Sequence, residues 1–262
     1  MNLSTMSFEL KDHIATITLN RPDAANALNL TMSQDLLAVA SRCDSADVRA
    51  VILTAQGKMF CAGGDVLSFA AAGAGVSELM RNMTAFLHSA ISRLARMNAP
   101  LITAINGTAA GAGLSMALAG DIILAAASAK FTMAYTKIGV SPDGSSTFFL
   151  PRLVGIAKAK EMILLNPVYT AEEAKSHGLV TEVLPDDALM ARANALAQQL
   201  AAGPTAAYGE AKRLLADTFS NSLETQMEME TRAIAGLAAY SNDTREGFKA
   251  FTEKRKPLFE GK

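Results

Sequence analysis

The 262-residue chain has no tryptophan, only two cysteines and few charged residues. Cys43 and Cys61 are too few for a disulfide framework, and no His/Cys cluster with metal-ligand spacing accompanies them. Charged residues make up 19% of the chain, below the roughly 25% of an average soluble protein, and the net charge is −1. A nucleic-acid-binding protein needs a basic face, so this balance argues against that class. The N-terminus also lacks the basic and apolar regions of a signal peptide, which favours a cytoplasmic location.

Half of the residues are hydrophobic, so the chain can bury a large core and is not a disordered protein. One stretch, between Arg96 and Asp121, carries no charge and imitates a membrane-spanning helix. Pro100 and the pair Asn106-Gly107 interrupt it. A buried strand, a turn and a helix of small residues therefore explain this stretch better than a membrane span.

Strands alternate with helices in the first half of the sequence. Segments 8–12 and 14–19 alternate apolar and polar residues and predict an antiparallel pair. Apolar runs at 50–54, 101–105 and 122–125 predict buried strands, and Lys130-Phe-Thr132 predicts a further short strand. We expect the Ala/Gly-rich residues that follow Asp65, as far as Gly75, to be mobile. After about residue 135 the pattern is almost wholly helical, so the sequence predicts an α/β body with a C-terminal helical region.

Two glycine-rich segments each follow a predicted strand. They are Phe60-Cys-Ala-Gly-Gly-Asp65 and Asn106-Gly-Thr-Ala-Ala-Gly-Ala-Gly113, and the second leads directly into a helix. Backbone N–H groups in such segments can face a developing negative charge, and two segments facing one another would form an oxyanion hole. Tight packing of a glycine-rich helix on a sheet is the alternative, and the spacing alone does not decide between them. A dinucleotide site is less well supported, because the third glycine of that motif is missing.

Asp143 is a candidate acid/base residue in the segment Ser141-Pro-Asp-Gly-Ser-Ser146. An aspartate at a helix start is often only an N-cap. Apolar flanks at 139–142 and 148–151 favour the acid/base role, because apolar surroundings make a carboxylate a stronger base. A serine hydrolase is the weaker alternative, because Gly113-Leu-Ser115-Met-Ala117 departs from the nucleophile motif. We interpret His88, within a long predicted helix, as a structural residue.

Several motifs together resemble the crotonase (enoyl-CoA hydratase/isomerase) superfamily over nearly the whole chain. They are Asn20-Arg-Pro-x-x-x-Asn26-Ala-Leu28, the two glycine-rich segments and the ending Arg245-Glu-Gly247-x-x-Ala250-Phe251-x-x-Lys254-Arg255. The resemblance implies an α/β fold with a crotonase-like ββα spiral core at residues 1–200 and a C-terminal helical trimerisation region at 201–262. It also implies an acyl-CoA thioester as substrate and a homotrimer or dimer of trimers. No cofactor, metal, nucleic acid or membrane is implied, since coenzyme A is part of the substrate.

The resemblance also assigns roles to individual residues. The oxyanion donors would be the backbone N–H groups of Gly64 and Ala112. Phe251 and Lys254 would reach the coenzyme A bound by a neighbouring subunit. The remaining residues expected to bind substrate or coenzyme A are Ala25, Ala27, Ala62, Asp65, Val66, Leu67, Ser115, Tyr135 and Ile138, and we expect Phe148 and the stretch 69–85 to contribute to the pocket wall.

The expected reaction follows from which acids are present. Hydratases of the superfamily carry glutamates at the positions of Ser115 and Tyr135, which argues against hydration here. The Asp143 segment resembles that of Δ3,Δ2-enoyl-CoA isomerases and of epoxyphenylacetyl-CoA isomerases, in which a lone acid moves a proton. The sequence therefore predicts an enoyl-CoA isomerase with Asp143 as its acid/base. The alternatives are a hydratase, a ring-opening isomerase, a thioester hydrolase or a non-catalytic acyl-CoA-binding member.

Overall fold

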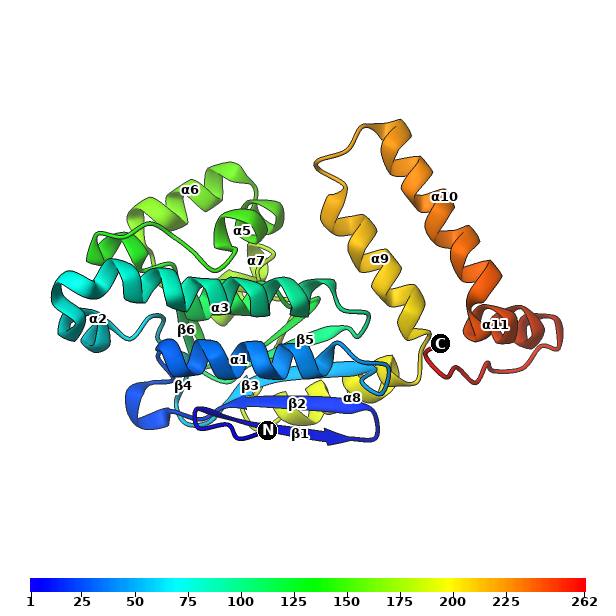
Figure 1. Ribbon diagram of the computed structural model, residues 1–262, viewed down its shortest axis with the longest axis horizontal. Coiled ribbons are helices and arrows are strands. Elements are labelled where there is room, and N and C mark those ends of the chain that lie inside the picture. The colour runs from blue at the N-terminus through cyan, green and yellow to red at the C-terminus, as the bar shows by residue number, and fades with distance from the viewer.

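Apolar segments form the larger of two β-sheets in the computed structural model, which describes all 262 residues (Figure 1). Its strand order is β1-β2-β3-β5-β7-β10. The strands are β1 (Met6–Lys11), β2 (Ile14–Leu19), β3 (Ala50–Ala55), β5 (Leu101–Ile105), β7 (Ile122–Ala126) and β10 (Glu182–Leu184). β1 and β2 are antiparallel and every other pair is parallel. The predicted antiparallel pair and the three predicted buried strands are confirmed.

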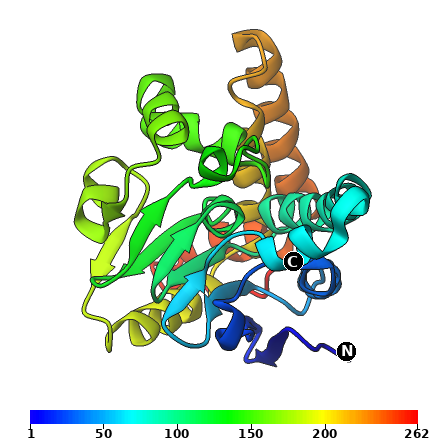
Figure 2. The ribbon, with the colours of Figure 1, turned by 90° about the vertical axis from the view of Figure 1, so that its left-hand side faces the viewer.

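The central strands of this sheet are covered on both faces. Every residue of β3 and β5 is buried, as expected for parallel strands whose apolar side chains point to both sides. Helix α8 (Leu189–Ala201) packs on β3, β5 and β7. In the end view, the strands lie between α1–α3 and the helices α7 and α8 (Figure 2).

A second, smaller sheet positions the site. Its order is β4-β6-β8-β9, with bounds β4 (Met59–Cys61), β6 (Thr108–Ala110), β8 (Lys130–Thr132) and β9 (Tyr169–Thr170). β4, β6 and β8 run parallel, so their carboxyl ends meet at one edge. Only β8 was predicted from the sequence, because strands of two or three residues are too short to show a periodic pattern.

Helices occupy most of the remaining chain. Their bounds are α1 (Leu30–Cys43), α2 (Val66–Ala72), α3 (Val76–Arg96), α4 (Ala112–Ala117), α5 (Ser146–Val154), α6 (Ile156–Leu165), α7 (Ala171–Ser176), α9 (Thr205–Asp217), α10 (Leu223–Tyr240) and α11 (Asn242–Thr252), with 3₁₀ turns η1 (Pro22–Ala24), η2 (Gly73–Gly75) and η3 (Tyr135–Ile138). The segment after Asp65 was expected to be mobile, but it forms α2 and η2. The Asp65 carboxylate accepts a hydrogen bond from the Ser68 N–H at 3.2 Å and so caps α2.

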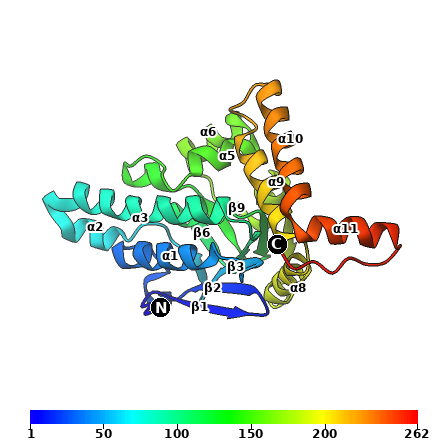
Figure 3. The same ribbon diagram turned by 45° about the vertical axis from the view of Figure 1, so that its right-hand side comes forward.

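The last three helices form a C-terminal arm, residues 205–262, which projects from the rest of the chain (Figures 1 and 3). A 2.7 Å ion pair between Lys212 of α9 and Asp121 joins the arm to the body. Burial raises the pKa of the Asp121 carboxyl and lowers that of the Lys212 amine. Helix α10 has no buried residue at all.

None of the helices has the length and apolar character needed to cross a membrane. The uncharged stretch before Asp121, which imitates a membrane span in the sequence, is divided among β5, β6 and α4.

Candidate active site

Three neighbouring strands bring the site together from distant parts of the sequence. The parallel strands β4, β6 and β8 end at one edge of the smaller sheet, and each leads into a segment that lines the same cavity. This active-site cavity has a volume of about 320 Å³. The segments contribute Gly63 and Gly64 after β4, Gly111 and Ala112 after β6, and Tyr135 after β8. The two glycine-rich segments therefore face a common space, as the oxyanion-hole interpretation requires.

The two expected oxyanion donors are backbone amides without an acceptor in their own elements. Gly64 forms an isolated parallel bridge with Leu28, whose hydrogen bonds use the Gly63 carbonyl and the Asp65 N–H. The Gly64 N–H is therefore outside that pairing. Ala112 is the first residue of α4, and the N–H groups of a first helical turn have no intrahelical acceptor. Both amides are thus available to an oxygen atom in the cavity.

Glycine is required where the two segments approach one another. Gly63 has φ +101°, a conformation that side chains rarely adopt, and an added Cβ would lie 3.1 Å from the Ala110 carbonyl oxygen. At Gly113 an added Cβ would lie 2.5 Å from the Cys61 carbonyl oxygen. Helix α4 therefore packs directly on the last residue of β4. Tight packing, one of the two alternatives offered by the sequence, is present, and it does not exclude the oxyanion-hole interpretation.

Asp143 lies in the same cavity but does not cap a helix. Its Oδ1 accepts a 2.6 Å hydrogen bond from the Tyr135 hydroxyl, while its Oδ2 has no such donor. Helix α5 begins after Ser145 without a side-chain cap, and Ser146 bonds only to the backbone carbonyl of Asp143. The N-cap alternative for the Asp143 carboxylate is therefore wrong.

Ser115 and Tyr135 form a chain of hydroxyl groups that ends at Asp143. The two hydroxyl oxygens are 2.8 Å apart, and the Ser115 hydroxyl also lies 3.2 Å from the Gly111 carbonyl oxygen. Ser115 is fully buried behind Tyr135 and does not line the cavity itself. Burial, reinforced by the Asp143 charge, raises the pKa of the Tyr135 phenol. Tyr135 is therefore a hydrogen-bond donor at neutral pH and not a base.

The structure brings one unexpected residue to the site. His88 of α3, interpreted from the sequence as structural, places its Nε2 3.7 Å from Asp143 Oδ2. The same nitrogen accepts a hydrogen bond of 3.2 Å from the Gly144 N–H. Fifty-five positions separate His88 from Asp143 in the sequence, and a histidine within an amphipathic helix gave no signal of this contact.

Apolar side chains form most of the cavity wall. They are Leu28, Val66, Phe69, Met80, Met83, Leu87, Ile138 and Val140. The expected roles of Ile138 and of the stretch 69–85 in the wall fit this arrangement. Phe148 does not contribute to it. It lies instead on a second cavity of about 970 Å³ between α3, α5 and α9, which we term the outer cavity.

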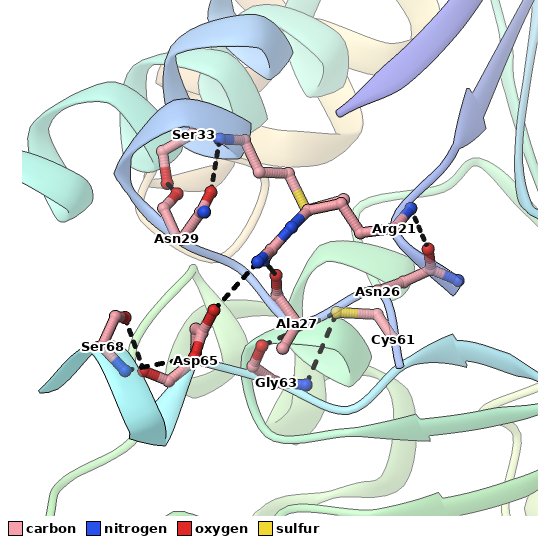
Figure 4. A network of polar contacts seen from close by, with 10 residues as sticks. Arg21, Asn26, Ala27, Asn29, Ser33, Cys61, Gly63, Asp65 and Ser68 are labelled. Atoms are coloured by element: carbon pink, nitrogen blue, oxygen red, sulfur yellow. Dashed lines mark hydrogen bonds and ion pairs between the residues drawn. The ribbon is translucent and has the colours of Figure 1, made fainter. Parts of the chain in front are cut away.

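A polar network around Arg21 borders the cavity at Ala62 and Val66, and we term this group the rim (Figure 4). Arg21 donates to the Ala27 carbonyl and pairs with Asp65 at 3.1 Å. The Ala62 N–H bonds to the Ala25 carbonyl, which joins the segment after β4 to the loop before α1. Val66 and Leu67 are 49% and 84% exposed beside this network. The predicted coenzyme A contacts at positions 25, 27, 62 and 65–67 are therefore neighbours along one rim.

Phe251 and Lys254 do not join this group. Phe251 is on α11 and Lys254 follows it, at the end of the molecule opposite α2 (Figures 1 and 3). Both are exposed, Phe251 to 86%. Within one chain these two residues are distant from the cavity.

Comparisons with known proteins agree with this architecture. Residues 9–262 match the family described as enoyl-CoA hydratase/isomerase. The chain is 40% identical to a "Probable enoyl-CoA hydratase" of Rhodobacter capsulatus over 100% of both chains, and 39% identical to the 1,2-epoxyphenylacetyl-CoA isomerase of Escherichia coli over 95% of both. The crystal structure of an enoyl-CoA hydratase from Bacillus anthracis superposes with a TM-score of 0.91, at 33% identity over 99% of this chain and 100% of that one. The predicted α/β fold with a C-terminal helical region is confirmed.

Proposed function

The chain belongs to the enoyl-CoA hydratase/isomerase family, and from this premise we propose that it is an enoyl-CoA isomerase. It would move a C=C bond along an acyl-CoA thioester, with Asp143 as its only acid/base residue. One observation carries the proposal: a single carboxylate, with one oxygen free of hydrogen-bond donors, shares a cavity with two free backbone amides.

The reaction requires a base at C2 and an acid at C4. The thioester oxygen would accept hydrogen bonds from the Gly64 and Ala112 N–H groups, which makes the C2 proton more acidic. Asp143 Oδ2 takes that proton and leaves a dienolate, whose charge is spread onto the thioester oxygen. The same carboxyl group then returns a proton to C4, so that one acid/base residue is enough for both steps.

The surroundings of Asp143 favour isomerisation over hydration. A hydratase must activate a water molecule, and in this family it carries glutamates where this chain has Ser115 and Tyr135. Here those two hydroxyl groups bond to one another and to Asp143. Because the pKa of the Tyr135 phenol is raised, neither side chain is a base for water at neutral pH.

Coenzyme A binding would involve two copies of the chain. In this proposal the coenzyme A moiety runs along the rim formed by Ala25, Ala27, Ala62 and residues 65–67. A neighbouring copy in a trimer or a dimer of trimers supplies Phe251 and Lys254. Two observations support this arrangement: α11 is distant from the active-site cavity of the same chain, and the C-terminal arm has an exposed apolar face.

A ring-opening isomerase is the second candidate. The relative from Escherichia coli is named a 1,2-epoxyphenylacetyl-CoA isomerase and is 39% identical over 95% of this chain. The same oxyanion donors and a lone carboxylate would serve that reaction. The wall of Phe69, Met80 and Met83 would accept a ring as well as an alkyl chain.

A panel of thioesters tests the proposal. Purified protein is incubated separately with a 3-enoyl-CoA, the matching 2-enoyl-CoA and 1,2-epoxyphenylacetyl-CoA, and products are identified by liquid chromatography and mass spectrometry. We expect interconversion of the two enoyl-CoA isomers. A 3-hydroxyacyl-CoA as the main product would indicate a hydratase, and free coenzyme A a thioester hydrolase. Turnover of the epoxide alone would favour the ring-opening isomerase, and binding without turnover the non-catalytic alternative.

A further inference from the structure

His88 lies between the two cavities. Its side chain is 50% exposed and lines the outer cavity, whereas Asp143, 3.7 Å away, lines the active-site cavity. An acyl chain that fills the active-site cavity covers Asp143 from that side. His88 then remains as the titratable side chain that contacts both Asp143 and the outer cavity.

The hydrogen bond to Gly144 defines the resting state of His88. Its Nε2 accepts from the Gly144 N–H at 3.2 Å, so this nitrogen carries no proton and the ring proton is on Nδ1. The 3.7 Å approach to Asp143 is therefore not an ion pair at rest. It places an unprotonated imidazole nitrogen beside the carboxylate.

The hydrogen bond from Tyr135 determines which oxygen of Asp143 can carry a proton. Tyr135 donates to Oδ1 at 2.6 Å, which leaves Oδ2 as the oxygen that receives a proton from substrate. Oδ2 is also the oxygen nearest to His88 Nε2. The substrate proton would thus arrive at the one atom of Asp143 that faces the imidazole.

We propose that His88 exchanges the proton held by Asp143 with water of the outer cavity during each turnover. This inference rests on the proposed isomerase function. The C2–H bond breaks and its proton joins Oδ2; the proton then passes to Nε2, and the resulting imidazolium releases its Nδ1 proton to water. The reverse sequence returns a solvent proton to Asp143 and from there to C4, so that no net proton is consumed. The first transfer requires Nε2 to release the Gly144 N–H, because that hydrogen bond uses the same lone pair, and to approach Oδ2 by roughly 1 Å.

The test measures how much deuterium from the solvent enters the product in each turnover. A 3-enoyl-CoA is isomerised in heavy water by the full-length protein, and deuterium in the 2-enoyl-CoA product is measured by mass spectrometry at low conversion. His88→Gln keeps an oxygen that can accept from the Gly144 N–H but cannot carry a proton. We expect deuterium per turnover to fall at least about threefold in this variant.

Ser92→Ala is the matched control, because Ser92 lies one helical turn further along α3 and lines the outer cavity. It should leave both quantities at their wild-type values. Equal deuterium per turnover in wild-type protein and His88→Gln would overturn the inference, and so would a loss of kcat without a change in label. Failure of the wild-type protein to isomerise the thioester overturns the proposed function, and this inference with it. Isomerisation with unchanged label overturns this inference alone.

Discussion

The Tyr135 hydroxyl donates a 2.6 Å hydrogen bond to Oδ1 of Asp143, and that carboxylate has no donor on Oδ2. A hydrogen bond on one oxygen fixes the plane of the carboxyl group and directs the other oxygen to substrate. Ser115, buried beneath the phenol, fixes Tyr135 in turn. In the proposed isomerase, the hydroxyl groups of Ser115 and Tyr135 would therefore position the single acid, Asp143.

Replacing Asp143 by asparagine tests the acid/base role. Asparagine keeps an oxygen that can accept from Tyr135, but it cannot take up a proton, so we expect kcat for a 3-enoyl-CoA to fall by about 10²–10⁴. The thermal midpoint should change little, because the carboxylate does not cap α5. Steady-state kinetics and circular dichroism measure the two quantities. Asp187→Asn, at an exposed position, is the control. A variant of Asp143 with near wild-type kcat would show that the base lies elsewhere.

Replacing Tyr135 by phenylalanine tests the positioning role. Hydrogen bonds to charged groups contribute about 1.5–3 kcal/mol, so we expect kcat to fall by about 10- to 100-fold, with KM nearly unchanged. Because burial raises the pKa of this phenol, wild-type kcat should show no ionisation of Tyr135 up to about pH 10. Tyr169→Phe, which removes a hydroxyl bonded to Glu161, is the matched control. If Tyr135→Phe were inactive while Asp143→Asn remained active, Tyr135 and not Asp143 would be the acid/base residue.

The sequence predicted the parts of the site that depend on local backbone. The glycine-rich segments at 60–65 and 106–113 have compositions that require close approach, and both line the cavity. Asp143 was also identified, but its competing reading as an N-cap could be rejected only when the structure showed Tyr135 as its partner. Hydrogen bonds between side chains from different elements leave no periodic signal in a sequence.

The contacts missed from the sequence depend on tertiary placement. His88 reaches Asp143 because α3 passes over the loop before α5, and nothing near either residue indicates that crossing. Phe148 was assigned to the wrong cavity for the same reason, since the face that α5 turns to the outer cavity is set by α3 and α9. The short strands β4 and β6 also escaped prediction, although their parallel pairing aligns the two glycine-rich segments.

The two cysteines should be unreactive in the folded protein. Burial raises the pKa of both the Cys43 and the Cys61 thiol to about 12, and the thiolate is the reactive form. A raised pKa keeps the thiol neutral at pH 8, where only roughly 10⁻⁴ of it would be ionised. We expect no alkylation by iodoacetamide at pH 8 without denaturant, and two alkylated residues in guanidinium chloride, by mass spectrometry. Rapid labelling of native Cys61 would contradict its burial against Gly113 of the second glycine-rich segment.

Lys254 should contribute to coenzyme A binding and not to chemistry. If it contacts a phosphate of the coenzyme A on a neighbouring copy, Lys254→Ala removes an interaction that is equal in the ground and transition states. KM for the thioester should then rise by about five- to tenfold, with kcat nearly constant. Lys249→Ala, an exposed lysine on α11, is the control and should leave KM unchanged. An unchanged KM in Lys254→Ala would make Lys254 a solvated surface charge.

The C-terminal arm should assemble the chain into a trimer or a dimer of trimers. Leu223 and Ile234 of α10 are 70% and 71% exposed in the single chain, and no residue of that helix is buried. Exposed apolar surface on this scale marks an interaction site in a soluble protein. Light scattering of the wild-type protein at micromolar concentration should give a mass three or six times that of the chain. Ile234→Glu places a charge on this face and should lower the mass. KM for the thioester should rise in the same variant, because a dissociated chain loses the partner's Lys254. A wild-type protein that is monomeric under these conditions would contradict both the assembly and the proposed sharing of coenzyme A between copies.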